Sequence, residues 1–186
     1  YQAALPEAAF DLLRDHFGVR HECYASPLNH HLDSFGSAFW DTDRWFGSKG
    51  SFLDQRPTEG GFQANPPFLE EVMAPMAMHV LALLERAQKM GSPLCFVVIW
   101  PGWDDTPAYD LLMTSRFMRH LIVFEKNDHY YTEGLQHRVT VQHLKYRLSK
   151  ARSFAFWMQT DAAAEKWPCK KETLESFKKA FMTKPY

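Results

Sequence analysis

The amino-acid sequence predicts an α/β domain in which an open sheet is covered by helices on both faces. Segments of strand character alternate along the chain with segments of helical periodicity, and the last strands form an antiparallel hairpin. One segment, "PLCFVVIWP" from Pro93 to Pro101, is a continuous apolar run, which is typical of a strand buried on both faces. In such sheets ligands bind at the carboxyl ends of the strands, so a functional site is expected in residues that directly follow a strand.

The first third of the chain contains one helix with a well-marked end. Apolar residues between Pro6 and Gly18 recur at helical spacing, and a glycine favours helix termination. Pro27 favours the start of a second helix. The expected elements are, in order, a helix over 6–18, a strand over 19–25, a helix over 27–39, a loop over 41–51, and short strands over 51–54 and 61–64.

The longest predicted helix runs from Phe68 to Gly91. Its apolar residues recur every three or four positions, and Pro75 predicts a kink or a restart near its amino end. The elements expected after it are, in order, the buried strand over 93–101, a helix over 107–120, a strand over 120–126, a hairpin turn at Glu133-Gly134, and a strand over 153–161.

Composition and charge describe an ordinary globular chain. The 186 residues are 46% hydrophobic and 23% charged, and the net charge of -1 does not indicate a nucleic-acid-binding protein. The three cysteines are isolated, which indicates buried thiols in a reducing compartment rather than a disulfide framework. The sequence has no 18-residue apolar run, no signal pattern and no initial Met. We therefore expect a single domain, residues 1–186, cut from a longer intracellular protein without a membrane partner.

Nine histidines raise the question of a metal site. His30 with His31, and His137 with His143, lack the ligand spacing that metal sites require, so we expect no metal. A basic run near the end of the chain is typical of a solvated face, with RNA contact as the alternative. Its members are Lys145, Arg147, Lys150 and Arg152.

The motif Asn65-Pro66-Pro67-Phe68 follows a predicted strand and opens the longest helix. It suits methyl transfer to the exocyclic amine of adenine, which is a poor nucleophile because its lone pair is delocalised into the ring. Two acceptors, the Asn65 carbonyl and the stiffened backbone carbonyl of Pro66, would orient the amine, and Phe68 would stack on the base. The structural alternative is a helix-entry turn with a buried Phe68.

A longer resemblance surrounds this motif. Four blocks occur in the order and spacing of the cap-specific adenosine N6-methyltransferases, also known as the phosphorylated-CTD-interacting-factor family. They are "ECYASPLN" (22–29), "SAFWDTDRWFGSKGSF" (37–52), "GGFQANPPFLEEVM" (60–73) and "SRFMRH" (115–120). The resemblance covers the chain from about Phe10 to Trp167. It implies a Rossmann-like class I methyltransferase domain that uses S-adenosylmethionine and acts on N6 of the first transcribed adenosine beside the mRNA cap, in the nucleus.

The resemblance also implies roles for individual residues. Asn65, Pro66, Pro67 and Phe68 match the catalytic motif. Residues that would bind the methyl donor are Ala25, Ser26, Pro27, Leu28, Asn29, Asp43, Phe46 and Gly47. Asp43 would take the ribose hydroxyls, a role for which Asp41 competes. Trp103 would line the substrate entrance. Arg116 and Arg119 are expected at the end of a helix, where they would either bind phosphate or favourably complement the helix C-terminus.

The sequence also departs from familiar members of the family. His30, His31 and Trp40 stand where other polar or small residues are expected, the loop over 128–143 diverges, and no Gly-rich donor loop is present. We expect the WW module and helical domain, through which capped mRNA and the phosphorylated RNA polymerase II tail would be bound, to lie outside this chain. Two other functions stay open, a non-catalytic adaptor with a methyltransferase fold and an N6-adenine methyltransferase acting on internal RNA or DNA.

Overall fold

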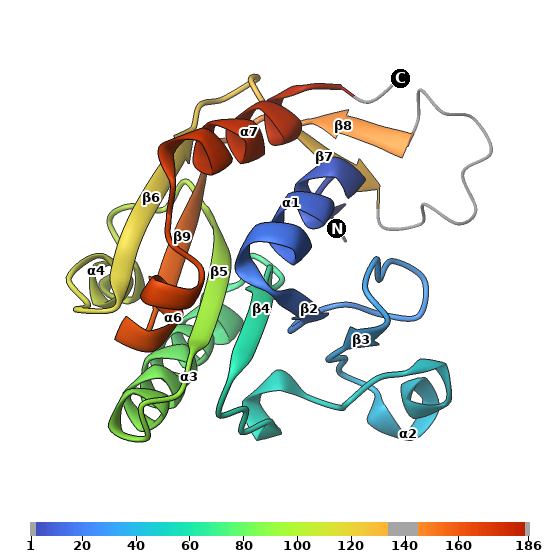
Figure 1. Cartoon of the computed structure of the whole chain (residues 1–186). Coiled ribbons are helices and arrows are strands. Elements are labelled where there is room, and N and C mark those ends of the chain that lie inside the picture. Colours follow the sequence, from blue (N-terminus) through green and yellow to red (C-terminus); the bar gives the residue numbers. More distant parts are fainter. Residues whose placement is uncertain (1–2, 134–144, 185–186) are drawn as a thin grey trace.

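A six-stranded mixed sheet forms the centre of the molecule (Figure 1). The computed structural model describes residues 3–133 and 145–184. The strand order is β3-β2-β4-β5-β9-β6, in which β9 runs antiparallel to both neighbours and the other pairs are parallel. The strands are β2 (Val19–Glu22), β3 (Ser34–Phe35), β4 (Gly60–Ala64), β5 (Leu94–Pro101), β6 (Met118–Phe124) and β9 (Ser153–Gln159).

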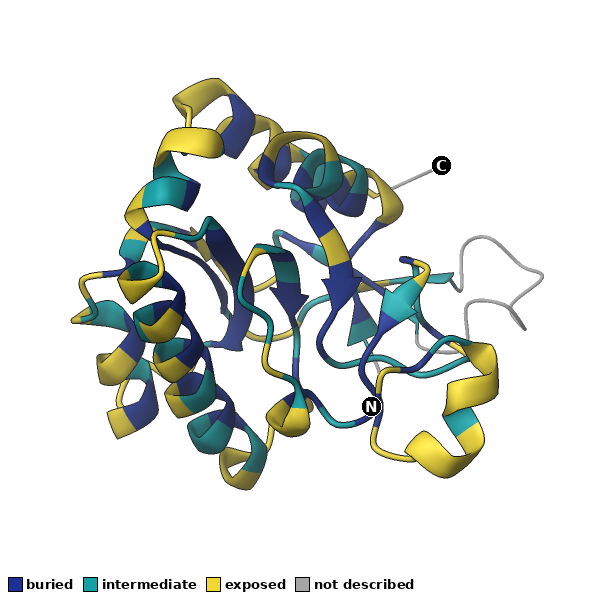
Figure 2. Cartoon of the chain, turned by 60° about the horizontal axis from the view of Figure 1, so that its bottom comes forward, coloured by how far each residue is buried: buried dark blue, intermediate teal, exposed yellow. Residues whose placement is uncertain are grey.

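Helices cover both faces of this sheet (Figures 1 and 2). The first face carries α1 (Glu7–Phe17), α6 (Asp161–Lys166) and α7 (Lys171–Met182), and the second carries α3 (Glu70–Lys89) and α4 (Pro107–Met113). Successive side chains of β5 point to opposite faces, so this strand contributes alternately to the two cores. All eight residues of β5 are buried, as the apolar run predicts. The predicted class, a mixed α/β sheet flanked by helices, is confirmed.

A second, three-stranded antiparallel sheet joins distant parts of the chain. It consists of β1 (Ala3–Ala4), β7 (Tyr130–Glu133) and β8 (Tyr146–Leu148), with Ala3 opposite Glu133. A strand of two residues has no sequence periodicity, so β1 was not predictable from the sequence. The strand β7 ends at Glu133, and Gly134 of the expected hairpin turn lies outside the described residues.

The helix expected over 27–39 is wrong. The segment forms a turn after Ser26, the strand β3, and an irregular connection, followed by α2 (Trp40–Asp43) and the 3₁₀ helix η1 (Arg44–Phe46). The reason is a tertiary hydrogen bond pattern: the Glu22 carboxylate accepts from the backbone N–H groups of His31 and Leu32, at 2.6 and 2.7 Å. A helix would require those donors for its own carbonyl groups.

Two further element predictions need correction. The strand expected over 51–54 is a 3₁₀ helix, η2 (Phe52–Asp54), because Ser51 caps it by accepting from Leu53 N. The helix expected over 107–120 ends at Met113, and residues from Met118 onward pair with β9 instead. Arg116 and Arg119 therefore do not lie at the end of a helix.

The termini of the long helix and the end of the chain also differ from expectation. Helix α3 begins at Glu70 rather than Phe68, and it continues through Pro75 without a restart. Helices α6 and α7 were not predicted from the sequence. Their signatures are present, however, since Thr160 caps α6 and α7 buries Leu174, Phe177 and Phe181 at helical spacing.

Candidate active site

A cavity of about 820 Å³ lies at the carboxyl ends of β2 and β4. These strands are neighbours, but the chain leaves β2 toward β3 on one side and returns to β4 on the other. Such a reversal of strand order is where ligands bind in open α/β sheets. The lining comes from the segments after β2 and β4, from the connection between β3 and η2, and from the second sheet. The volume is that of a site for a small molecule or nucleotide.

Asn65 directly follows β4 and its side chain has a fixed orientation. Its Nδ2 donates a hydrogen bond of 2.6 Å to the backbone carbonyl of Ala3 in β1. A carbonyl only accepts, so the amide nitrogen must lie on this side and Oδ1 on the other. Within residues 3–133 and 145–184 no group donates to Oδ1. Asn65 therefore offers a held acceptor at the cavity wall.

Pro66, Pro67 and Phe68 continue the cavity wall. The Pro67 carbonyl accepts from Leu69 N at 2.8 Å, whereas no N–H or O–H of the described residues donates to the Pro66 carbonyl. Phe68 is 36% exposed. The motif does lead into α3, as the structural alternative expects, but the burial of Phe68 that this alternative requires is wrong. The motif thus combines one exposed ring with two carbonyl oxygens that accept no hydrogen bond from the part of the chain that the structure describes.

The loop after β2 forms a closed turn beside this motif. Asn29 Oδ1 accepts from Ser26 N and Ser26 Oγ, at 2.7 and 3.0 Å, and the Ser26 carbonyl accepts from Asn29 N at 3.1 Å. Ala25, Ser26 and Asn29 line the cavity, whereas Pro27 and Leu28 do not. A side-chain carbonyl thus organises the backbone where a Gly-rich loop is absent.

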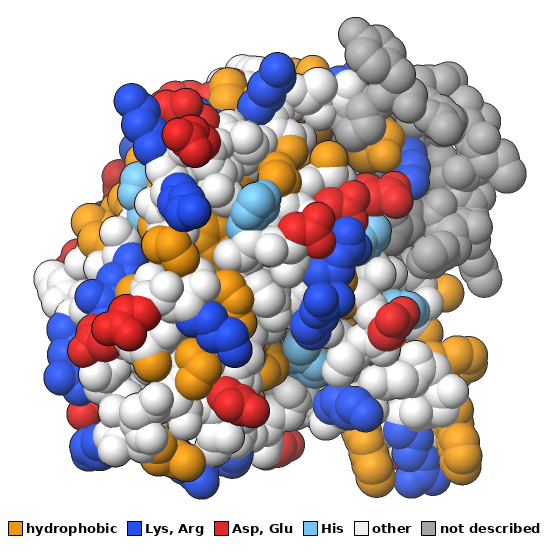
Figure 3. All heavy atoms as spheres, in the orientation of Figure 1, with side chains coloured by type: hydrophobic (Ala, Val, Ile, Leu, Met, Phe, Trp, Pro, Cys, Tyr) orange, Lys and Arg blue, Asp and Glu red, His pale blue; other side chains and the backbone are white. Residues whose placement is uncertain are grey.

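Of the two candidate aspartates, the structure brings Asp43 to the cavity and leaves Asp41 outside its lining. Asp43 is half-buried at the end of α2, and Thr42 Oγ1 donates to its carboxylate at 3.2 Å. Phe46 and Gly47 follow within four residues but do not line the cavity. Figure 3 shows that this part of the molecule, at the lower right, exposes hydrophobic side chains on either side of basic ones.

Sequence reasoning missed the wall that the second sheet contributes. Tyr131 of β7 and the segment from Arg147 to Ala151 line the cavity, including Lys150. Arg147 Nε pairs with Glu133 Oε2 at 2.5 Å, which joins β8 to β7. The only available sequence feature was the basic run, for which RNA contact was one of two interpretations. The structure brings Arg147 and Lys150 of that run to the cavity, whereas Arg152 pairs with Asp104.

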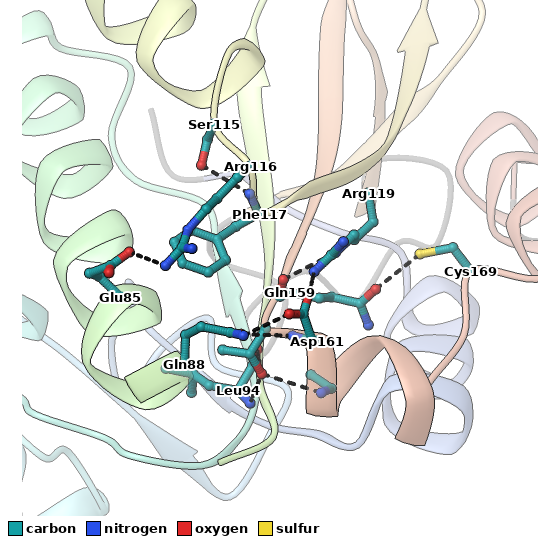
Figure 4. Close-up of polar contacts among 12 residues, drawn as sticks. Glu85, Gln88, Leu94, Ser115, Arg116, Phe117, Arg119, Gln159, Asp161 and Cys169 are labelled. Carbon is teal, nitrogen blue, oxygen red and sulfur yellow. Dashed lines mark hydrogen bonds and ion pairs between the residues drawn. The ribbon is translucent and has the colours of Figure 1, made fainter. Parts of the chain in front are cut away.

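Arg116 and Arg119 lie away from the cavity, near the amino end of β6 (Figure 4). Arg116 pairs with Glu85 at 2.6 Å, and Arg119 pairs with Asp161. The hydrogen bond from Arg119 lowers the pKa of the Asp161 carboxyl. These contacts join α3, β6 and α6. Trp103 follows β5 at the carboxyl edge of the sheet, but it does not line the cavity.

The histidines that raised the metal question make aromatic contacts. His30 stacks on Phe35 with ring centroids 4.6 Å apart, and His31 stacks on Phe10 at 4.8 Å. His137 and His143 lie outside the described residues. In the parts of the chain that the structure describes, no three His, Cys, Asp or Glu side chains group together so that they could hold a metal ion. None of the described helices is long and apolar enough to cross a membrane.

Glu22 is buried at the end of β2, and burial raises the pKa of its carboxyl to about 7, although the N–H groups of Leu32 and His31 oppose the shift. The folded protein then binds more protons than the unfolded chain between the ordinary pKa of 4.5 and about 7. The contribution of Glu22 to stability is complete below pH 4.5 and is lost as pH rises through 7. The loss is on the order of 3 kcal/mol.

We expect Glu22→Gln to remove this part of the pH dependence, because a neutral amide oxygen still accepts from both backbone N–H groups. Urea unfolding between pH 4.5 and 8 measures it as the difference between wild type and variant. The difference is required because burial lowers the pKa of His21 to about 4, which gives a slope of opposite sign. Parallel stability curves for wild type and Glu22→Gln would contradict the prediction.

Together these features define an α/β protein with a nucleotide-sized cavity at the switch point of its sheet. Residues 1–134 match the family model described as "Phosphorylated CTD interacting factor 1 WW domain", and the chain belongs to this family. The predicted family resemblance is thereby confirmed. The matched residues include β2, β4 and β5 with the Asn-Pro-Pro-Phe motif.

Two curated relatives are similar over nearly the whole chain. Proteins of Homo sapiens and Mus musculus, both named mRNA (2'-O-methyladenosine-N(6)-)-methyltransferase, are each 39% identical over 182 residues. The alignment covers 97% of this chain but 25% of each relative. The chain thus spans about a quarter of the length of these proteins.

Proposed function

We propose that residues 1–186 form the methyltransferase domain of a larger enzyme, and that it transfers a methyl group from S-adenosylmethionine to N6 of the cap-adjacent adenosine of mRNA. The names of the two relatives and the family match support this proposal. The observation that carries it is that Asn65 Oδ1 and the Pro66 carbonyl lie at one cavity wall, and that neither oxygen accepts a hydrogen bond from the described residues. A class I, Rossmann-like arrangement agrees with the strand order and with the cavity at its switch point.

The residues of the motif act on the adenine amine. Asn65 Oδ1 and the Pro66 carbonyl each accept a hydrogen bond from one N–H of the amine. These two hydrogen bonds favour the pyramidal amine, in which the lone pair is localised on nitrogen. The same acceptors would stabilise the positive charge that develops on nitrogen as the new N–C bond forms and the methyl–sulfur bond of the donor breaks, which leaves a neutral thioether; the excess proton on nitrogen then leaves to water. Phe68 stacks on the base and fixes its plane. Orientation of this kind supplies proximity without a metal or a strong base.

The remaining cavity residues fit a methyl donor. S-Adenosylmethionine supplies an electrophilic methyl group on a sulfonium. The Asp43 carboxylate is of the type that accepts from ribose hydroxyls, and Ala25, Ser26 and Asn29 of the turn after β2 line the same cavity. Pro27, Leu28, Phe46 and Gly47 stay outside the proposed contacts because they do not line the cavity. Arg116, Arg119 and Trp103 are left out for the same reason.

We expect the whole protein to methylate an RNA that begins with a capped adenosine, and to methylate uncapped RNA and DNA far less. Nuclease digestion of the product followed by mass spectrometry locates the methyl group and counts it. Methylation confined to the first nucleotide supports the proposal. Equal methylation of internal RNA or of DNA adenine would contradict the cap-adjacent substrate while leaving the chemistry in place. A nuclear location follows from this substrate and stays a prediction.

The lack of glycine between residues 23 and 29 favours a second candidate, a non-catalytic adaptor that has lost its methyl donor. Calorimetry with S-adenosylhomocysteine separates the two. Binding heat that disappears in Asp43→Ala supports the enzyme. No heat at millimolar ligand would support the adaptor, for which nothing requires the oriented amide of Asn65.

A further inference from the structure

The segment that carries α2 and η1 exposes several large aromatic rings. Trp40 is 51% and Trp45 77% exposed, and Phe39 and Phe46 are also exposed. A cluster of exposed aromatic rings more often marks a binding surface than a part of the surface without a function. Figure 3 shows hydrophobic side chains gathered at the lower right, where Figure 1 places α2.

A guanidinium group lies between two of these rings. The central carbon of the Arg44 guanidinium is 5.0 Å from the ring centroid of Trp40 and 4.8 Å from that of Trp45. We call these three side chains the Trp–Arg–Trp stack. In the described residues no carboxylate forms an ion pair with Arg44. Its positive charge is therefore available to an anionic ligand, and both indoles are exposed, Trp45 more than Trp40.

The stack is held in place although it is exposed. Gly47 ends η1 in a left-handed conformation, with φ of 102°, and the Ser48 hydroxyl bonds to that of Ser37 at 2.6 Å. Lys49 N then donates to the Phe35 carbonyl of β3 at 2.7 Å. The Trp40 ring lies so close to Gly50 that a Cβ there would meet it at 3.2 Å. A preorganised surface loses little conformational entropy on binding.

The stack is continuous with the cavity. Phe39 immediately precedes α2 and lines the cavity, as does Asp43, the residue before Arg44. A ligand that fills the cavity and extends out of it along this wall reaches the stack next. The cavity wall formed by the second sheet adds Lys150, so that an extended anion would pass between basic groups.

We propose that the Trp–Arg–Trp stack binds unpaired bases of the RNA that follow the target nucleotide, with Arg44 pairing a phosphate between them. The inference rests on the proposed function. Aromatic stacking accepts any base, and each stacked base contributes about 1–3 kcal/mol. The charge of Arg44 selects among the bases of a capped RNA, because a cationic methylguanine is repelled by the guanidinium whereas neutral bases and phosphates are not. The stack therefore takes the RNA body and not the cap base.

The test measures the Kd of the whole protein for two RNAs, a capped dinucleotide and a capped octanucleotide. Binding is followed by fluorescence anisotropy without a methyl donor. We expect Trp45→Ala to raise the Kd for the octanucleotide about 5- to 100-fold and to leave the Kd for the dinucleotide within about twofold. We expect Arg44→Gln to reduce the slope of log K against log salt for the octanucleotide by about 0.7. Met90→Ala, which removes a similarly exposed side chain (56%) after α3, serves as control and changes neither Kd.

An unchanged Kd for the octanucleotide would overturn the inference and would leave the rings to a protein partner. An equal increase in Kd for both RNAs would also overturn it, and would assign the rings to the cap end. Because binding is read without methyl transfer, this outcome is distinct from failure of the proposed function. If RNA is methylated and Trp45→Ala binds it normally, only the stack is refuted. If no RNA is methylated but Trp45→Ala still weakens octanucleotide binding, the stack is supported and the proposed reaction is not.

Discussion

Replacing Asn65 by alanine is expected to lower the rate of methyl transfer by about 100-fold or more, with little change in the binding of S-adenosylhomocysteine. Removal of one oriented acceptor from a charge-stabilising pair typically costs about 2.7–4 kcal/mol of transition-state stabilisation. The loss falls on kcat, because the acceptor gains strength only as positive charge develops on the amine. Single-turnover methylation of a capped, adenosine-initiated RNA measures it.

Asn65→Asp is the matched control for this experiment. A carboxylate keeps an acceptor of the same shape, but it cannot donate to the Ala3 carbonyl that fixes the wild-type amide. We expect activity between those of wild type and Asn65→Ala. Near-full activity of Asn65→Ala would show that the amide does not hold the adenine amine, and the proposed mechanism would then be wrong.

Replacing Gly61 by alanine is expected to destabilise the fold by about 3 kcal/mol. Gly61 lies in β4, where the strand passes close to the connection between α1 and β2. A Cβ at this position would lie 2.3 Å from the Phe17 carbonyl oxygen and 2.7 Å from the Gly18 carbonyl carbon. Both contacts are with backbone, which cannot rotate away, so the cost equals or exceeds that of ordinary overpacking. Urea unfolding at neutral pH measures the change.

Gly91→Ala provides the control for this effect. Gly91 follows α3 with φ of 66°, and a Cβ there would meet nothing within 4 Å. The substitution therefore tests only the left-handed backbone, for which we expect a cost of about 1 kcal/mol. Similar losses for the two variants would contradict the claim that β4 and the turn at Gly18 are in direct backbone contact.

The parts of the fold that sequence predicted are those in which local pattern and tertiary environment agree. The apolar run of β5 and the periodic stripe of α3 needed no knowledge of their neighbours. The prediction of a helix over 27–39 was wrong because one buried carboxylate, that of Glu22, accepts hydrogen bonds from two backbone N–H groups of the segment. The prediction that the helix continues after Met113 was wrong because residues from Met118 onward pair with β9, and this pairing outweighs their helical spacing.

The same distinction separates the residues of the candidate site that were predictable from those that were not. Ala25, Ser26, Asn29 and Asn65 were predictable because they directly follow β2 and β4, and the carboxyl ends of parallel strands meet at one edge. Tyr131 and Lys150 were not, because they reach the cavity through a sheet whose pairing the sequence does not reveal. Arg116 and Arg119 were expected at the end of a helix, either to bind phosphate or to complement the helix C-terminus, and pairing with Glu85 and Asp161 gives them a structural environment instead.

The hydrogen bond from Asn65 to Ala3 links the proposed catalytic amide to β1, a strand of two residues. Its two partners are 62 positions apart, and Ala3 is itself held by pairing with Glu133 in β7. The amide is aligned only while this short pairing persists, and strands of two residues open more readily than a buried eight-residue strand. Opening of β1 alone would then release the Asn65 side chain while the six-stranded sheet stays folded. Under the proposed mechanism, methyl transfer and global stability are thus separable, and heat or denaturant should remove the first before the second.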